Sequence, residues 1–360
     1  MNPLAAELAR LIAADGPLPL SRFMAEALGH PKYGYYTTRE PFGTDGDFVT
    51  APEISQMFGE LVGLWCAQSW LDRGGPAPCA LVELGPGRGT CMADALRAAA
   101  ALPAFRAALT PHLVEMSPRL RERQRLTLAG HDAVWHEDIA TLPDGPALIV
   151  ANEFFDALPI RQFQRAADGW HERVVGLQDC ALALALAPGT MPESLLPAPL
   201  RNAAPDSIVE LSPARSSMMR QLAERIVSQG GALLAIDYGY APSAAGDTLQ
   251  AVRAHRPVPV LETPGKADLT AHVDFQALAE VATEAGATVH GPTDQGDWLR
   301  RMGIKERAAA LQSKASPEQA QAIDVAVARL TEPAQMGTLF KVLAVTGPDD
   351  PAPAGFEGAA

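Results

Sequence analysis

The chain has 360 residues, 48% of them apolar, so it can bury a substantial core as one large domain or one domain with insertions. Its formal net charge of -13 and its lack of a Lys/Arg-rich run disfavour nucleic acid as a partner, because phosphate backbones would be repelled. The first 20 residues lack the continuous apolar run of a signal peptide or membrane span, which predicts no membrane association and, by default, a cytoplasmic protein.

The first part of the chain, residues 1–78, is predicted to form a helical cap with a covering loop. Residues 1–30 and 54–71 carry apolar side chains at helical spacing. The loop between them, residues 33–55, combines glycines, aromatic residues and acids. Such a mixture is suited to touching a ligand, and it is equally typical of a long connector.

From residue 79 to residue 346, strands and helices alternate, which predicts a mostly parallel sheet with helices on both faces. The expected strands are residues 79–83, 112–115, 133–136, 147–151, 231–236 and 337–346. The expected helices are residues 90–101, 118–128 and 274–285. This pattern indicates an α/β domain.

Two insertions interrupt the repeat. Residues 161–187 alternate like a β-hairpin, and the proline-rich stretch 187–205 is expected to be a loop. This first insertion suits either a substrate dock or a homodimer contact. The second, residues 240–272, is too long for a connector and is expected to act as a lid. The tail, residues 347–360, is rich in proline, alanine and glycine and is predicted to be disordered.

A glycine-rich turn follows the first expected strand. It consists of Gly85, Gly87 and Gly89, with Pro86 between the first two. Because glycine adopts positive φ and has no side chain, such a turn lets a ligand approach the backbone closely. A dinucleotide fingerprint needs its third glycine where Thr90 stands, so a pyrophosphate ligand is disfavoured. Glu83 would place a carboxylate near an amino-acid ammonium group, which suits S-adenosylmethionine and would repel a diphosphate.

The next strands end in groups that suit the rest of that cofactor. Glu115, after the second strand, can accept hydrogen bonds from both ribose hydroxyls. Asp138, after the third strand, is placed to meet the adenine amino group, with Met116 and Ile139 as apolar walls for the ring. The turn alone could be structural, but consecutive strands with such ends predict S-adenosylmethionine as the cofactor.

Six segments carry a resemblance to a known family. They are Gly46–Glu60, Glu83–Gly89, Ala151–Pro159, Ile236–Gly239, Ala267–Phe275 and Met336–Lys341, and the first and third of them are more specific than a glycine-rich turn. On these residues the chain resembles the MidA family, the bacterial relatives of a mitochondrial complex I assembly factor that is a protein arginine methyltransferase. The resemblance implies a Rossmann-like class I methyltransferase fold with a seven-stranded sheet. For the eukaryotic member it implies methyl transfer to arginine of a respiratory-complex subunit.

Residues Asn152 to Asp156 end the fourth strand at the sheet edge where ligands of such folds bind. If the acceptor is arginine, its guanidinium stays charged and needs carboxylates to orient it, so Glu153 and Asp156 are the expected acceptor-binding pair. Asp237, after the fifth strand, is expected to face the same cleft. His272 is a candidate proton acceptor or lid contact, although a histidine beside a helix start is commonly structural.

The loop before residue 56 supplies further candidate cofactor contacts. They are Thr50, Pro52 and Glu53, and Asn152 is expected to join them. We expect no metal site, because the four cysteines are widely spaced and the histidines lack metal-ligand spacing. Asp156 could equally cap a helix, so its functional role stays open.

Three other interpretations stay open. The acceptor could be another nitrogen or a small molecule, because Asn152–Phe155 loosely resembles the element with which amide and adenine methyltransferases hold a planar nitrogen. The chain could also bind S-adenosylmethionine without catalysis, as an assembly chaperone. A nicotinamide-dependent oxidoreductase is disfavoured by Glu83 and by the displaced third glycine.

Overall fold

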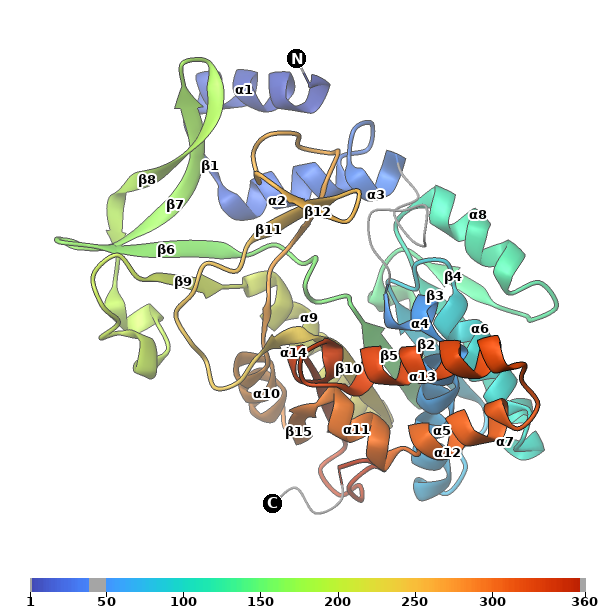
Figure 1. Cartoon of the computed structure of the whole chain (residues 1–360). Coiled ribbons are helices and arrows are strands. Elements are labelled where there is room, and N and C mark those ends of the chain that lie inside the picture. Colours follow the sequence, from blue (N-terminus) through green and yellow to red (C-terminus); the bar gives the residue numbers. More distant parts are fainter. Residues whose placement is uncertain (1, 39–49, 357–360) are drawn as a thin grey trace. The chain divides into compact units, whose positions relative to one another are not determined.

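The computed structural model describes residues 2–38 and 50–356 (Figure 1). The chain divides into two compact units, each assembled from separate stretches of sequence. The first unit comprises residues 1–48, 156–218 and 240–277, and the second comprises residues 49–155, 219–239 and 278–360. The N-terminal helices therefore group with the two expected insertions, rather than forming a cap that ends at residue 78. Within the described residues, no helix has both the length and the apolar character needed to cross a membrane.

The second unit holds the alternating elements. Its helices are α4 (Ala51–Ile54), α5 (Gln56–Asp72), α6 (Thr90–Ala99), α7 (Pro103–Ala108), α8 (Pro118–Thr127), η1 (Ile139–Thr141), most of α9 (Pro213–Gln229) and of α10 (Phe275–Glu284), α11 (Gln295–Arg301), α12 (Ile304–Gln312), α13 (Pro317–Thr331) and α14 (Met336–Leu339). Its strands are β2 (Cys79–Leu84), β3 (Leu109–Val114), β4 (Val134–His136), β5 (Ala147–Asn152), β10 (Gly231–Tyr240), β15 (Thr288–Asp294) and β16 (Phe340–Thr346).

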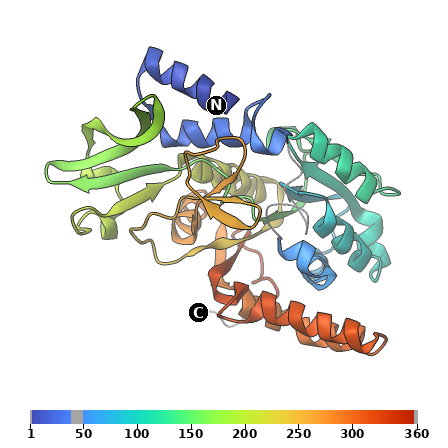
Figure 2. The same ribbon diagram turned by 45° about the horizontal axis from the view of Figure 1, so that its top comes forward.

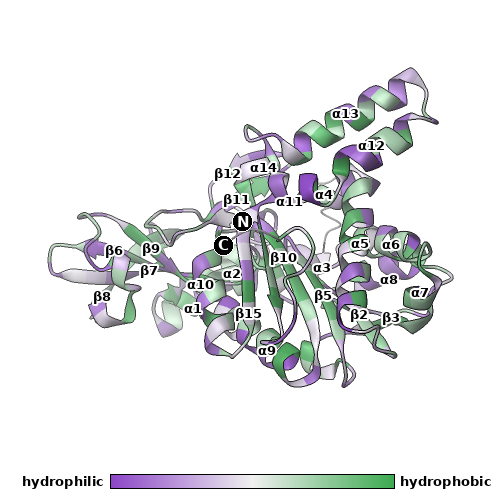
Figure 3. Ribbon diagram, turned by 90° about the horizontal axis from the view of Figure 1, so that it is seen from below, coloured by the Kyte–Doolittle hydropathy of each residue, from purple (hydrophilic) through white to green (hydrophobic). Residues whose placement is uncertain are grey.

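Seven strands of the larger sheet follow the order β15–β16–β10–β5–β2–β3–β4. The strands from β10 to β4 are parallel neighbours, whereas β16 runs antiparallel to both β10 and β15. Figure 3 shows β5 and β10 largely in green, as expected for strands buried on both faces. The predicted α/β fold with a mostly parallel sheet is confirmed. The carboxyl ends of the parallel strands meet at one edge, where ligands bind in such sheets.

The core of the second unit lies between the sheet and helices that include α5 and α6. It contains Phe58 and Trp65 of α5, Leu96 of α6, Leu81 of β2 and Leu148 of β5. The helix expected from the apolar residues of 54–71 is present as α5, but it is buried on almost every side, so these residues do not form a single apolar stripe. Farther along the chain, α12 and α13 lie side by side, coloured orange to red in Figure 2.

The first unit contains the N-terminal helices and two smaller sheets. Its elements are α1 (Pro3–Asp15), β1 (Leu18–Pro19), α2 (Leu20–Gly29), α3 (Tyr35–Thr38), β6 (Arg161–Ala166), β7 (Gly169–Gln178), β8 (Ala181–Met191), η2 (Glu193–Leu195), η3 (Ala198–Leu200), β9 (Ile208–Leu211), β11 (Gln250–Arg253), β12 (Arg256–Val258), β13 (Asp268–Thr270) and β14 (Val273–Asp274). One sheet has the order β1–β7–β6–β9 with β8 on β7, and the other has the order β12–β11–β13. A core that includes Leu8, Phe23, Val175 and Leu269 joins the α1–α2 region to these strands.

Three predictions need correction. The stretch 187–205 is not all loop, because β8 continues to Met191 and pairs with β7 as far as Trp170. The last strand begins at Phe340 rather than residue 337, since residues 336–339 form the helical turn α14. The tail is ordered as far as it is described: Phe356 is only 3% exposed, and Asp350 pairs with Arg73 at 2.9 Å.

Candidate active site

The glycine turn joins β2 to α6. Gly85, Gly87 and Gly89 have φ values of 59°, 53° and 80°, in the left-handed region that favours glycine. Gly89 is the N-cap residue of α6, so the turn leads directly into the positive end of that helix. A Cβ atom at Gly85 would lie 3.1 Å from the Phe154 ring. The turn therefore has the strand-to-helix geometry that was expected of a cofactor-binding loop.

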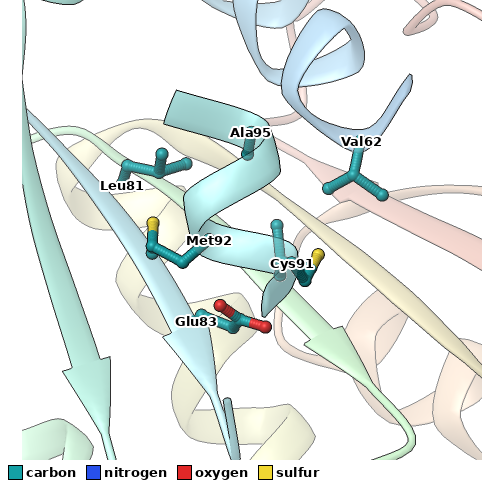
Figure 4. A pocket seen from close by; sticks show the side chains of 7 residues that line it. Val62, Leu81, Glu83, Cys91, Met92 and Ala95 are labelled. Atoms are coloured by element: carbon teal, nitrogen blue, oxygen red, sulfur yellow. The ribbon is translucent and has the colours of Figure 1, made fainter. Parts of the chain in front are cut away.

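Glu83 is enclosed between β2 and the first turn of α6. Its side chain lines a small cavity between β2 and α6, together with Leu81, Cys91 and Met92 (Figure 4). Burial raises the pKa of Glu83 to about 8, although the Met92 N–H and the Cys91 thiol donate hydrogen bonds that oppose the shift. Its expected contact with a ligand ammonium group stays a prediction. The geometry shows a carboxyl group enclosed under the first turn of α6.

Glu115 stands directly after β3 and is largely buried. Its Oε1 accepts a hydrogen bond from the Ser117 N–H at 2.8 Å, and its Oε2 accepts one from Gln124 Nε2 at 3.1 Å. Burial raises the pKa of Glu115, and these hydrogen bonds act in the opposite direction. The neighbouring Met116 is 75% exposed, so its side chain is accessible for a ligand contact.

Asp138 and Ile139 follow β4. Asp138 is exposed, and its Oδ1 accepts a hydrogen bond from the Ala140 N–H at 2.8 Å as the N-cap of η1. Ile139 is buried next to it. The structure therefore gives Asp138 a capping role, and its predicted contact with an adenine amino group remains a prediction.

The short helix α4 contributes Glu53 to the glycine turn. Glu53 Oε1 accepts a hydrogen bond from the Thr90 hydroxyl at 2.6 Å, and Glu53 Oε2 pairs with Arg88 Nη1 at 3.4 Å. Thr50 is the N-cap residue of α4 and Pro52 lies in its first turn, and both are buried. Residues 39–49, which include part of the predicted covering loop, lie outside the described residues.

The ends of β5 and β10 bring Asn152, Glu153 and Asp237 to the same sheet edge. Glu153 Oε1 accepts hydrogen bonds from the Ala51 N–H at 3.1 Å and from Asn152 Nδ2 at 3.3 Å. Glu153 has a φ of 49°, which is uncommon for a residue with a side chain. Asp237 is wholly buried, and its Oδ2 accepts a hydrogen bond from the Phe154 N–H at 3.2 Å.

The other two predicted catalytic residues, Asp156 and His272, belong to the first unit. Asp156 is buried, and its Oδ1 accepts a hydrogen bond from the Ala157 N–H at 2.8 Å. The backbone N–H of His272 donates to the Thr248 hydroxyl at 2.9 Å, and burial together with Arg215 lowers the pKa of His272. The four predicted catalytic residues thus fall into two pairs, one in each unit.

Sequence reasoning missed two side chains that support the glycine turn. Gln124, from α8, contacts both the turn and Glu115, and Trp135, from β4, bonds to Gln124. Gln124 is one of many polar and charged residues on α8, and no sequence pattern distinguishes it from the others. Arg88, in contrast, lies inside the turn, and its sequence position could have suggested a role.

The chain is similar in sequence to several known proteins. A family model described as "Putative S-adenosyl-L-methionine-dependent methyltransferase" matches residues 61–293. The mitochondrial protein arginine methyltransferase NDUFAF7 homolog of Drosophila melanogaster is 38% identical over 374 residues, which cover 95% of this chain and 84% of the relative. The mitochondrial protein arginine methyltransferase NDUFAF7 of Mus musculus is 37% identical over 374 residues, which cover 96% and 84%.

The chain is also similar to a solved structure. The crystal structure of a Burkholderia thailandensis protein bound to S-adenosyl-homocysteine has a TM-score of 0.85 and 32% sequence identity. The match covers 99% of this chain and 94% of that chain.

One prediction is overturned by these names. The sequence was expected to be cytoplasmic because it showed no targeting segment, but the fly and mouse relatives are named as mitochondrial proteins. The default was wrong because a missing apolar leader says nothing about other kinds of targeting segment.

Proposed function

The chain belongs to the family of S-adenosyl-L-methionine-dependent methyltransferases that its residues 61–293 match, and from this membership we propose that it methylates arginine side chains of a protein. The sequence resemblance to the relatives of a mitochondrial arginine methyltransferase is confirmed. The enzyme is an S-adenosylmethionine-dependent methyltransferase. We propose arginine as the acceptor because the fly and mouse relatives are named protein arginine methyltransferases.

The residues of the second unit fit this cofactor. When bound, S-adenosylmethionine supplies a methyl group activated by a sulfonium. The three glycines with positive φ leave three positions of the turn without a side chain, so that a ligand can approach the backbone there. Glu115, at the end of β3, provides a carboxylate of the kind that accepts hydrogen bonds from a ribose diol. We propose Asp138, Met116 and Ile139 as the contacts of the adenine ring.

Glu153 is the residue that we propose to hold the acceptor. A guanidinium group stays charged in proteins, so a fixed carboxylate can orient it and stabilise its charge as one nitrogen attacks the methyl group. The carboxylate of Glu153 is held by the Ala51 N–H and by Asn152, and its backbone has an unusual φ of 49° at the strand end. Asp237 supports the same segment through the Phe154 N–H. Asp156 and His272 stay proposals as further contacts of the acceptor.

The proposed reaction can be tested with purified enzyme, radiolabelled S-adenosylmethionine and matched peptides that contain either arginine or lysine. Label recovered as methylarginine after hydrolysis would support the proposal. Label in another residue, or in a small molecule alone, would contradict it. Label in no acceptor, with normal cofactor binding, would favour the non-catalytic chaperone.

Glu153→Gln tests the proposed acceptor contact. The amide can still accept the Ala51 hydrogen bond but carries no charge, so we expect methyl transfer to fall by roughly a hundredfold. Binding of S-adenosylhomocysteine should stay within about twofold of the wild type. Glu284→Gln, which neutralises an exposed carboxylate on α10, is the control and should be fully active. Equal activity of the two variants would show that the charge of Glu153 does not hold the acceptor.

The sequence resemblance adds a finer proposal, that the acceptor is a subunit of a respiratory complex. Incubation of purified complex I with the enzyme and labelled cofactor tests it. Methylarginine confined to one subunit would support this acceptor, and an unlabelled complex beside a labelled arginine peptide would contradict it.

A further inference from the structure

Gln124 is a buried polar residue close to the cofactor site. It lies on α8 and its side chain is wholly shielded from solvent. A buried amide is costly unless each of its polar atoms is hydrogen-bonded. An apolar residue would fill this position at lower cost, so the contacts of the amide need an explanation.

Both polar atoms of the Gln124 amide are hydrogen-bonded. Its Nε2 donates to the Gly87 carbonyl oxygen at 2.8 Å and to Glu115 Oε2 at 3.1 Å. Its Oε1 accepts a hydrogen bond from Trp135 Nε1 at 2.9 Å. An indole N–H can only donate, whereas a carbonyl and a carboxylate can only accept. The three partners therefore allow a single orientation of the amide, with Nε2 toward the turn.

We propose that Gln124 is a positioning residue of the cofactor site, which fixes the Gly87 carbonyl and the Glu115 carboxylate relative to each other. Gly87 belongs to the turn that the cofactor approaches, and Glu115 is the proposed ribose acceptor. One side chain thus connects the loop after β2 with the end of β3. Trp135 holds the amide in place from β4. The inference rests on the proposed role of Glu115, and it does not depend on the identity of the methyl acceptor.

The electrostatics of Glu115 explain why this contact matters. Its carboxylate is buried, so it must be hydrogen-bonded to remain an acceptor for ribose. The Ser117 N–H binds Oε1, and Gln124 binds Oε2. The Met116 N–H and the Arg121 charge also favour the ionised carboxylate. Without Gln124, Oε2 loses its buried amide donor and the carboxylate loses its connection to the glycine turn. Recognition of the ribose should then weaken more than the fold does.

The test is calorimetric titration with S-adenosylhomocysteine and with its 2′-deoxy analogue. Gln124→Met keeps the side-chain length and removes all three hydrogen bonds. We expect its affinity for S-adenosylhomocysteine to fall by roughly ten- to a hundredfold. The dissociation constant of the 2′-deoxy analogue divided by that of S-adenosylhomocysteine should also move toward one, because a misplaced carboxylate no longer distinguishes the ribose from its deoxy form. Trp135→Phe, which removes a single N–H donor, should shift both measures in the same direction by a smaller factor.

Gln162→Met is the matched control. Gln162 is also wholly buried, and its amide donates to Glu210 and Asp247 and accepts from Arg173, but it lies on β6 in the first unit. Its loss should lower the melting temperature and leave the affinity for S-adenosylhomocysteine within about twofold. A purely structural role for Gln124 predicts that the two variants behave alike.

Three outcomes would overturn the inference. They are an unchanged affinity ratio in folded Gln124→Met, an equal loss of affinity in Gln162→Met, and absence of S-adenosylhomocysteine binding by the wild type. The last would also remove the cofactor assignment. Normal cofactor binding without any methylarginine would contradict the acceptor proposal alone and would leave the role of Gln124 intact.

Discussion

Glu83 shows how one buried acid couples the fold to pH. Burial between β2 and α6 is the main cause that raises the pKa of Glu83 to about 8, and the nearby Asp94 carboxylate acts in the same direction. The folded protein therefore binds a proton at Glu83 over a range in which the unfolded chain has released it. By linkage, the free energy of unfolding that Glu83 contributes is highest below its unfolded pKa of about 4.5 and is lost as the pH rises through about 8.

Glu83→Gln should remove this dependence on pH. The neutral amide resembles the protonated acid, so we expect the variant and the wild type to be similarly stable at pH 5. At pH 8.5 the variant should be more stable, by an amount on the order of 4 kcal/mol, because the folded wild type must either ionise this buried group or take up a proton that the unfolded chain has released. Urea unfolding at both pH values measures the difference. A stability difference that does not change with pH would show that Glu83 is ionised in the folded state at pH 5.

The positions of some site residues could be predicted from the sequence. Spacing alone placed the glycines of the turn and Glu115, because a strand-to-helix turn and the end of a parallel strand are local features. Spacing could not show that Glu83 lies under α6, since that depends on how closely the helix packs on β2. Nor could it identify Gln124, whose partners come from three separate segments.

At the scale of elements, the position of α6 depends on two glycines of α5. Gly59 and Gly63 are one turn apart on α5 and face α6. A Cβ atom at Gly63 would lie 2.7 Å from the backbone of Ala95, closer than real Cβ atoms approach. These glycines therefore let the two helices pack closely, and this packing places the N-terminus of α6 and Gly89 at the cofactor turn.

Gly63→Ala should separate these helices. We expect a loss of about 1–3 kcal/mol in the free energy of unfolding, because the added methyl meets backbone that cannot move without shifting α6. The affinity for S-adenosylhomocysteine should fall as well, since the turn moves with α6. Gly29→Ala, at the end of α2 with no atom within 4 Å of the new methyl, is the control and should be neutral or slightly stabilising. Denaturant unfolding and calorimetry measure both effects, and a Gly63→Ala variant as stable as Gly29→Ala would refute close packing here.

In the larger sheet, strands with continuous apolar runs were predictable, whereas β15, which lacks such a run, was missed. The runs of β2, β5 and β10 are buried on both faces and appear directly in the sequence. The strand β15 was missed because its sequence contains Gly291 and Pro292, and its pairing with β16 shifts register between His290 and Thr293. Glycine and proline within residues 288–294 are typical of a turn, and the segment is a strand only because it pairs with β16.

At the scale of the whole molecule, chain order and spatial grouping differ. The sequence suggested a cap, a domain with insertions and a tail, in that order. The structure instead assembles the first unit from three separate stretches of chain. Local patterns could not predict this, because long-range packing decides which stretches share a core: Leu8 and Phe23 join Val175 and Leu269, far along the chain.

The division into two units predicts which segments cofactor binding should protect from hydrogen exchange. Every predicted cofactor contact, from Thr50 to Asn152, belongs to the second unit. A ligand that binds only the native state stabilises it by about 2.7 kcal/mol at a hundred times its dissociation constant. Hydrogen exchange measured by mass spectrometry should therefore slow by up to roughly a hundredfold in residues 79–93 and 109–124 when S-adenosylhomocysteine is added.

The β7–β8 hairpin, residues 169–191, provides the internal comparison for this measurement. It belongs to the first unit and contains no predicted cofactor contact, so its exchange should be unchanged if the units open independently. Equal protection of the hairpin and of the segments around β2 and β3 would contradict the prediction. It would mean that the units unfold as one cooperative body, so that cofactor binding stabilises the first unit as much as the second.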